Sequence, residues 1–349
     1  MKDEKILFFD TKPYDRQFFG EANREYGFQL KYLNNRLNED TADLARGYRI
    51  ISIFVNDMVS EAVADKLSEL GVKLVALRSA GYNNVDLDAV YDRIHVVRVP
   101  EYSPYAIAEH AVALMMTLNR KIHRAYFRVR DNNFAINGLM GFDMHGKTAG
   151  VIGTGRIGKT LLEILKGFGM NLLAYDPKPD EEEASGMGFK YVDLETLYAK
   201  SDIISLHCPL TRETEYIINQ ESIGAMKDGV MIINTGRGKL IDTKALIENL
   251  KTGKIAYAGL DVYEEESEFF YEDLSSSFIS DDVLARLMTF HNVVITSHQG
   301  FFTKEALANI AETTLSNVRE FIEGGYLKNE ICYRCDRDKC VKAEGEKCF

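Results

Sequence analysis

Residues 149–158 read Ala149-Gly150-Val151-Ile152-Gly153-Thr154-Gly155-Arg156-Ile157-Gly158, and this stretch decides the fold. Its apolar start predicts a buried strand, and the glycines in a G-x-G-x-x-G pattern predict a tight turn that opens a helix. Gly153 would permit the turn, Gly155 would let the backbone approach a pyrophosphate, and Gly158 would let the helix pack closely on the strand. The free N–H groups at the helix start, where Arg156 and Ile157 lie, would bind the anion.

The next strand-like run, residues 171–175, ends in Asp176. A carboxylate at that position can accept hydrogen bonds from both ribose hydroxyls and would repel a 2'-phosphate. The sequence therefore predicts NAD rather than NADP as the cofactor, although the nearby Lys178 weakens this discrimination. The alternative is a glycine turn in an α/β protein that binds no nucleotide.

The bulk composition indicates a globular chain of two domains. The 349 residues are 46% hydrophobic and 27% charged, with a net charge of -11 and no basic stripe, which argues against nucleic acid as a partner. The charged start, Met1 to Lys5, precedes an apolar run too short for a signal peptide, and the run from Ala106 to Leu118 contains Glu109 and His110 and is too short to span a membrane. We expect a cytoplasmic protein with no membrane partner.

Strand-like and helical runs alternate along both halves of the chain, which predicts an α/β fold of two Rossmann-like domains, each a doubly wound parallel sheet, with a cleft between them. The expected substrate domain is discontinuous and comprises residues 1–101 plus 300–331, whereas residues 102–299 form the NAD-binding domain and 332–349 a tail. Ser103 and Pro104 predict the start of a helix that continues to about Arg130. Strands are expected at Ile6–Asp10, Phe28–Leu33, Ile50–Val55, Leu74–Leu77, His95–Val99, Ile203–Cys208, Val230–Asn234, Ala256–Leu260 and Val293–Ser297, and a last helix at 304–323.

Three polar side chains follow successive strands of the second domain, where doubly wound folds bind ligands. Arg237, in Thr235-Gly236-Arg237-Gly238, could pair with a substrate carboxylate and polarise a carbonyl, while Gly236 would let the backbone approach a cofactor. His298 could exchange a proton with that carbonyl oxygen, and Glu266 could hold the other ring nitrogen and raise the pKa of the imidazole. None of these roles needs a metal. Singly, the histidine could be structural and the acid a solvated surface residue; together, they favour reduction of a 2-oxo acid.

The chain resembles the D-isomer-specific 2-hydroxyacid dehydrogenases, and within them the fermentative D-lactate dehydrogenases of bacteria, over about residues 4–331. The motifs that carry the resemblance are 149–158 with Asp176, His207-Cys208-Pro209-Leu210-Thr211, Asn234-Thr235-Gly236-Arg237-Gly238, Gly259-Leu260-Asp261-Val262-Tyr263-Glu264, Ser297-His298-Gln299-Gly300-Phe301-Phe302-Thr303, and the run from Phe269 through Asp282.

The resemblance implies an NAD-dependent oxidoreductase that interconverts pyruvate and D-lactate, with Arg237, Glu266 and His298 as its catalytic residues. It further assigns the Cys208, Pro209 and Thr235 positions to the cofactor, Asp261 to the nicotinamide amide, and Ser79, Ala80, Gly81 and Tyr102 to the substrate. The alternative substrates are larger 2-oxo acids, such as those that give hydroxyisocaproate or phenyllactate. A further alternative function is that of an NADH-sensing binding protein. We expect the chain to form a homodimer or a homotetramer.

Four cysteines, Cys332, Cys335, Cys340 and Cys348, lie in the last residues, beyond the end of the resemblance. Their spacing lacks a second C-x-x-C and matches no common zinc module, although zinc or an iron–sulfur cluster is an alternative. We expect an accessory tail without a catalytic role, and no disulfides in a reducing compartment.

Overall fold

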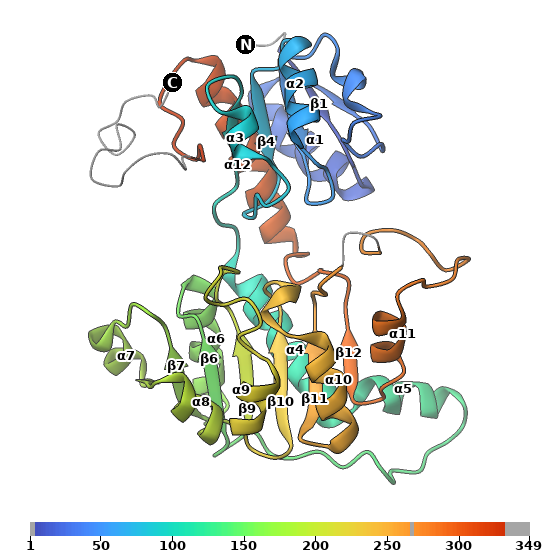
Figure 1. The fold of residues 1–349 in the computed structure, drawn as a ribbon, viewed down its shortest axis with the longest axis vertical. Coiled ribbons are helices and arrows are strands. Elements are labelled where there is room, and N and C mark those ends of the chain that lie inside the picture. The colour runs from blue at the N-terminus through green and yellow to red at the C-terminus, as the bar shows by residue number, and fades with distance from the viewer. Residues whose placement is uncertain (1–3, 266–268, 332–349) are drawn as a thin grey trace. The chain divides into compact units, whose positions relative to one another are not determined.

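The computed structural model describes residues 4–265 and 269–331 and divides the chain into two compact units. The first unit runs to Ser103 and resumes at Thr303, and the second unit runs from Pro104 to Phe302 (Figure 1). Each unit is built on its own parallel sheet, so the expected α/β class with two doubly wound parallel sheets is confirmed.

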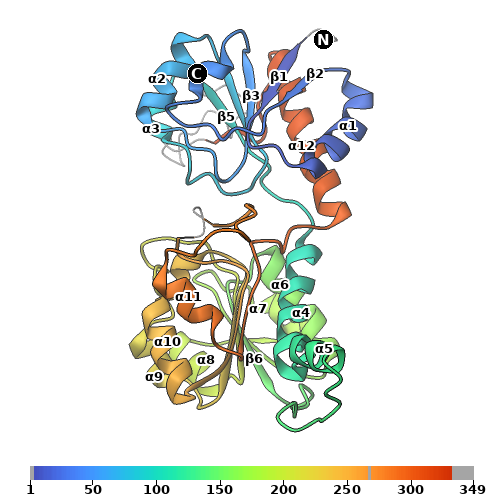
Figure 2. The ribbon, with the colours of Figure 1, turned by 90° about the vertical axis from the view of Figure 1, so that its right-hand side faces the viewer.

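The first unit has a five-stranded sheet in the order β2-β1-β3-β4-β5. This is a doubly wound order, in which the direction of winding reverses between β1 and β3 and ligands bind at that point. Figure 2 shows α1 and α12 on one face of the sheet and α2 and α3 on the other. The elements are β1 Lys5–Phe8, α1 Pro13–Tyr26, β2 Gln29–Tyr32, β3 Ile50–Ile53, α2 Glu61–Glu69, β4 Leu74–Leu77, α3 Leu87–Val90, β5 His95–Val97 and α12 Lys304–Ile322, with a 3-10 turn at Ala42–Ala45.

A group of buried charges lies at the carboxyl edge of this sheet. Arg78 is 2% exposed, and its Nη2 donates to the carbonyl oxygen of Phe9 at 2.8 Å. Asp57 is fully buried, and its carboxylate accepts from the backbone N–H groups of Leu37 and Phe54, both at 2.6 Å. Burial raises the pKa of Asp57 to about 7, despite the opposing charge of Arg78.

The second unit has a seven-stranded parallel sheet in the order β12-β11-β10-β9-β6-β7-β8. Counted from β6, this is the dinucleotide-binding order, in which the direction of winding reverses between β6 and β9. Helices α4 to α7 lie on one side of the sheet and α8 to α11 on the other in Figure 2. The elements are α4 Pro104–Arg120, α5 Ile122–Arg130, β6 Thr148–Ile152, α6 Arg156–Gly167, β7 Asn171–Tyr175, α7 Glu181–Met187, β8 Lys190–Tyr191, α8 Leu194–Lys200, β9 Ile203–Leu206, α9 Gln220–Ala225, β10 Val230–Asn234, α10 Thr243–Thr252, β11 Ile255–Leu260, α11 Asp282–Met288 and β12 Val293–Ile295, with a 3-10 turn at Gly238–Leu240.

The central strands of this sheet are buried on both faces. All five residues of β10 and all four of β9 are buried, which explains their unbroken apolar runs. One core cluster packs around Leu114 and Leu161 on the side of α4 and α6, and another packs around Ile232 and Leu246 on the side of α10. The fold therefore fixes the carboxyl ends of β6, β9, β10 and β11, where the candidate residues begin.

One expected helix is interrupted. The segment from Pro104 to Arg130 forms two helices, because Lys121 between them adopts a left-handed conformation with φ 50°. Within the described residues, no helix is both long enough and apolar enough to cross a membrane.

Candidate dinucleotide-binding and catalytic site

The glycine loop between β6 and α6 is tightly enclosed at two of its three glycines. Gly153 has φ +94°, and a Cβ there would lie 2.6 Å from the backbone N of Cys208. A Cβ on Gly158 would lie 2.0 Å from the carbonyl oxygen of Gly153. Gly155 differs, because its φ is -65° and a Cβ there would meet nothing within 4 Å. Backbone packing within the protein therefore requires glycine at positions 153 and 158. At position 155 no protein atom requires glycine, and the absence of a side chain there leaves open space next to the start of α6.

Asp176 follows β7 beside this loop. Its Oδ2 accepts from the backbone N–H of Thr154 at 2.9 Å, and its Oδ1 accepts from the N–H of Lys178 at 2.9 Å. These bonds fix the carboxylate against the glycine loop, and each oxygen retains a lone pair that can accept a hydroxyl.

His207 and Cys208 follow β9, at the point where the winding of the sheet reverses. The Nε2 of His207 lies 2.8 Å from the Oγ of Ser205, and burial lowers the pKa of His207 to about 4, so the ring is neutral near pH 7. Burial likewise raises the pKa of Cys208 to about 11, which keeps its thiol protonated. Neither side chain is suited to exchange protons in the reaction. Pro209, the next residue, is exposed.

The turn after β10 is held by its own polar groups. Asn234 donates through Nδ2 to the carbonyl oxygen of Arg237 at 2.8 Å and accepts the N–H of Gly236 at 3.0 Å. The Nη1 of Arg237 donates to the carbonyl oxygen of Gly236 at 2.8 Å, and the guanidinium is half-buried. A Cβ on Gly238 would lie 2.1 Å from the backbone of Tyr263, so glycine is required where this turn meets the one after β11.

His298 lies on the turn that follows β12. It adopts a left-handed φ of 50°, and its backbone N–H donates to the carbonyl oxygen of Asp261 at 2.7 Å. The hydroxyl of Tyr271 donates to the carbonyl oxygen of His298 at 2.9 Å. Since β10, β11 and β12 are neighbours, the turns bearing Arg237, Asp261 and His298 lie at one edge of the sheet.

Comparison with known proteins identifies the family. Residues 112–300 match the family model described as the NAD-binding domain of D-isomer-specific 2-hydroxyacid dehydrogenases. The chain is 54% identical to a 2-hydroxyacid dehydrogenase homolog of Haemophilus influenzae and 52% identical to the D-lactate dehydrogenase of Escherichia coli, in both cases over 94% of this chain and 99% of the relative. It also superposes on the apo-structure of the Escherichia coli D-lactate dehydrogenase with a TM-score of 0.87 and 51% identity, covering 94% of this chain and 100% of the other. The chain belongs to the D-isomer-specific 2-hydroxyacid dehydrogenase family.

The family's cofactor, NAD, fits the groups that the second unit presents. The open space at Gly155 lies at the start of α6, where backbone N–H groups can bind a pyrophosphate. The Thr235 hydroxyl at the end of β10 is buried and has no hydrogen-bond partner among the described residues, so a polar group of a bound cofactor would satisfy it. Arg156 and Ile157 form the first turn of α6.

The substrate residues expected from the resemblance lie in the first unit, after β4 and β5. The Oγ of Ser79 donates to the carbonyl oxygen of Gly81 at 2.7 Å, and the Nη1 of Arg98 donates to the carbonyl oxygen of Ala80 at 2.8 Å. The guanidinium of Arg98 also lies 5.2 Å from the ring centroid of Tyr82. Arg98 therefore anchors the Ser79–Gly81 loop, and Tyr102 is half-buried on the segment that follows β5.

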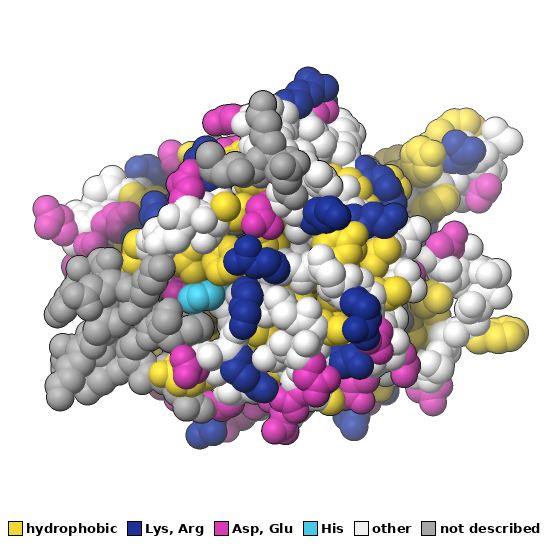
Figure 3. Space-filling model, turned by 90° about the horizontal axis from the view of Figure 1, so that it is seen from above, with side chains coloured by type: hydrophobic (Ala, Val, Ile, Leu, Met, Phe, Trp, Pro, Cys, Tyr) yellow, Lys and Arg dark blue, Asp and Glu magenta, His cyan; other side chains and the backbone are white. Residues whose placement is uncertain are grey.

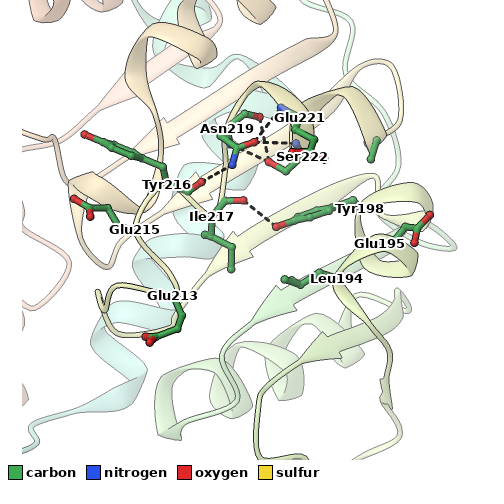
Figure 4. Close-up of a pocket in the computed structure, with 11 residues that line it drawn as sticks. Leu194, Glu195, Tyr198, Glu213, Glu215, Tyr216, Ile217, Asn219, Glu221 and Ser222 are labelled. Carbon is green, nitrogen blue, oxygen red and sulfur yellow. Dashed lines mark hydrogen bonds between the residues drawn. The ribbon is translucent and has the colours of Figure 1, made fainter.

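A separate hollow of about 600 Å³ lies among α8, α9 and the loop before α9 (Figure 4). Its rim carries Glu195, Glu213, Glu215 and Glu221. The polar groups inside it pair with one another, as in the bond from the Tyr198 hydroxyl to the carbonyl oxygen of Ile217 at 3.0 Å. None of the predicted site residues lines this hollow.

Two of the sequence expectations lie outside the described residues. Glu266 is one, and the tail cysteines Cys332, Cys335, Cys340 and Cys348 are the other. Among the residues that the structure does describe, no cluster of His, Cys, Asp and Glu could hold a metal ion.

Sequence reasoning did not select His110, Thr296 or Arg98, which the structure places beside candidate residues. His110 Nε2 lies 3.0 Å from the Oγ1 of Thr296 and 3.3 Å from Oδ1 of Asp261. The signal for His110 was a histidine within the mostly apolar helix α4, because a polar ring on a packed helix requires a partner.

Proposed function

We propose that this enzyme is an NAD-dependent D-lactate dehydrogenase that reversibly reduces pyruvate to D-lactate and so regenerates NAD in fermentation. The similarity to the Escherichia coli D-lactate dehydrogenase, 52% identity over nearly the full length of both chains, is the observation that supports this substrate. Such a role places the enzyme in the cytoplasm, with the NADH that it oxidises.

The proposed roles follow from the chemistry of each side chain. The bound nicotinamide supplies or accepts a hydride at the substrate carbon. Arg237 pairs with the substrate carboxylate and polarises the carbonyl oxygen, since its planar fork presents parallel N–H groups. His298 donates a proton to that oxygen during reduction and takes it back in the reverse direction. Glu266 is proposed to hold the second ring nitrogen of His298 and to favour the protonated ring.

The remaining site residues keep the roles that the resemblance implies. The Ser79–Gly81 loop is proposed to bind the substrate carboxylate through its backbone, and Tyr102 to contact the substrate. Phe301 and Phe302, which follow the His298 turn, have ring centroids 6.1 Å apart. We expect these two rings to line the substrate pocket, where their bulk would favour a small 2-oxo acid.

The alternative is a dehydrogenase for larger 2-oxo acids. We would measure kcat/KM for pyruvate, 2-oxoisocaproate and phenylpyruvate with NADH, and determine the chirality of lactate made from pyruvate. We expect the highest kcat/KM with pyruvate and D-lactate as the product. A preference for the larger acids would refute the substrate, whereas NADH binding without turnover of any of them would favour the NADH-sensing alternative.

We also propose that the enzyme is a homo-oligomer that uses the surface of α5 and the segment after it. The side chains of Phe127, Phe134, Ile136 and Met140 are 66%, 72%, 81% and 86% exposed. Large apolar side chains that are exposed together on one segment typically mark a protein interface. On the face shown in Figure 3, Lys and Arg side chains lie among hydrophobic side chains and Asp and Glu.

The oligomer is tested by replacing both Phe134 and Ile136 with serine and measuring the mass in solution by light scattering. We expect the wild type to form a dimer or tetramer and the double variant to shift toward smaller species. A monomeric wild type would refute this part of the proposal.

A further inference from the structure

The turn that carries His298 is held in a conformation that residues other than glycine seldom adopt. Its φ of 50° lies in the left-handed region, where the Cβ of an L-residue is crowded by its own backbone. A strained residue of this kind persists only where its surroundings determine it, so the contacts of the turn show what holds His298 in place.

The Asp261 carboxylate accepts three hydrogen bonds from this turn. Its Oδ1 accepts from the Oγ1 of Thr296 and from the backbone N–H of Gln299, the latter at 2.9 Å, and its Oδ2 accepts from the N–H of Gly300 at 2.7 Å. Asp261 is 1% exposed, so these bonds form away from water. They fasten the turn on both sides of His298, while the His298 N–H is itself bonded to the Asp261 carbonyl.

His110 ties this cluster to helix α4. Its Nε2 donates to Thr296 Oγ1 at 3.0 Å and lies 3.3 Å from Asp261 Oδ1. Burial alone would raise the pKa of Asp261, but the bonds from His110 and Thr296 hold it below its usual range, so the carboxylate stays ionised and accepts all of its bonds.

Gly300 completes the arrangement. A Cβ on this residue would lie 3.0 Å from Asp261 Oδ2 and 3.5 Å from the ring of His110, so a larger residue would crowd the bond between its N–H and the carboxylate.

We propose that Asp261 and His110 are positioning residues that hold the turn of His298 in its left-handed conformation. The inference rests on the proposed acid/base role of His298. It predicts that replacing His110 or Thr296, which bond to one another beside the Asp261 carboxylate, lowers the rate of the step in which His298 transfers a proton.

The test compares His110→Leu, His110→Gln and Thr296→Val in the full-length enzyme. Leucine removes the donor at the Nε2 position, whereas the glutamine amide can place an N–H there. We expect His110→Leu and Thr296→Val each to lower kcat about tenfold, with the Kd for NADH unchanged within about twofold and with a larger solvent deuterium isotope effect on kcat, since proton transfer from a displaced His298 becomes slower. His110→Gln should restore most of the rate.

The control is Thr314→Val, which removes a buried hydroxyl bonded to the Ile310 carbonyl at 2.7 Å on α12 of the first unit. It should match the wild type in kcat and isotope effect. The double variant His110→Leu/Thr296→Val should be no slower than the slower single variant, because both changes release the same turn.

Normal kcat in both His110→Leu and Thr296→Val would overturn the inference, as would a weakened Kd for NADH in these variants with kcat unchanged. A crystal structure of His110→Leu adds a readout that does not depend on activity: we expect residue 298 to leave the left-handed region, and a retained φ near 50° would contradict the proposal. Failure of the proposed function can be told apart from failure of this inference. It would appear as full activity in His298→Gln or as no turnover of 2-oxo acids by the wild type.

Discussion

Replacing Gly155 with alanine tests whether the open space at the glycine loop belongs to the cofactor. The backbone of Gly155 is one that alanine adopts freely, and its Cβ would touch no described atom within 4 Å. Alanine is a poorer helix N-cap than glycine, but it also restricts the unfolded chain, so the free energy of unfolding should change by less than about 1 kcal/mol. NADH binding, in contrast, should weaken.

The expected loss follows from geometry. A methyl group at the start of α6 would push a pyrophosphate outward by about 1 Å and stretch at least one charge-assisted hydrogen bond from about 2.9 Å to a length at which it is lost. Such a bond contributes about 1.5–3 kcal/mol, so the Kd for NADH should rise by about 10- to 150-fold.

Gly158→Ala is the matched comparison. Its Cβ would lie 2.0 Å from the Gly153 carbonyl oxygen, so the backbone must shift, and we expect a loss of roughly 3 kcal/mol or more in the free energy of unfolding. Urea unfolding and isothermal titration with NADH measure both quantities. A Gly155→Ala enzyme that binds NADH as tightly as the wild type would refute the reasoning, and so would one that is as destabilised as Gly158→Ala.

Three further predictions follow from the described contacts. Asp176→Ala should relax the preference for NADH over NADPH, because the carboxylate that would repel a 2'-phosphate is gone; unchanged discrimination in kcat/KM would show that another group sets it. Arg237→Lys should raise the KM for pyruvate and lower kcat, since an ammonium cannot replace the guanidinium fork, and a wild-type KM would count against the assigned role. Asp57 has a pKa raised from 3.8 to about 7 in the folded chain, so its contribution to stability is full below about pH 4 and is lost as the pH rises through 7. Relative to Asp57→Asn, which does not titrate, the wild type should therefore lose up to about 4 kcal/mol of unfolding free energy between pH 4 and pH 8. Parallel stability curves for the two proteins would contradict this assignment.

The sequence predicted the parts of the fold that depend on local pattern. The apolar runs of β9 and β10 and the glycines of the 153–158 loop reflect burial and close backbone approach, which act over a few residues and leave a readable signature. The break at Lys121 left none, because a left-handed lysine has no distinctive composition around it.

The candidate site was predictable only in part, for the same reason. Arg237 and His298 follow recognisable strands, so their positions at the sheet edge could be inferred. The bonds among His110, Asp261 and Thr296 join residues that are far apart in the chain, and no local spacing reports them. The conformation of His298 likewise depends on these distant partners rather than on its neighbours in sequence.

The path of the chain through its two units bears on how the protein is synthesised. The second unit is one continuous segment, from Pro104 to Phe302, whereas the first unit is completed only when α12 packs against α1. The ribosome therefore synthesises the whole second unit before it synthesises α12, the helix that completes the first unit. Until α12 has been synthesised, the apolar face of α1 that packs against it stays uncovered in the nascent chain.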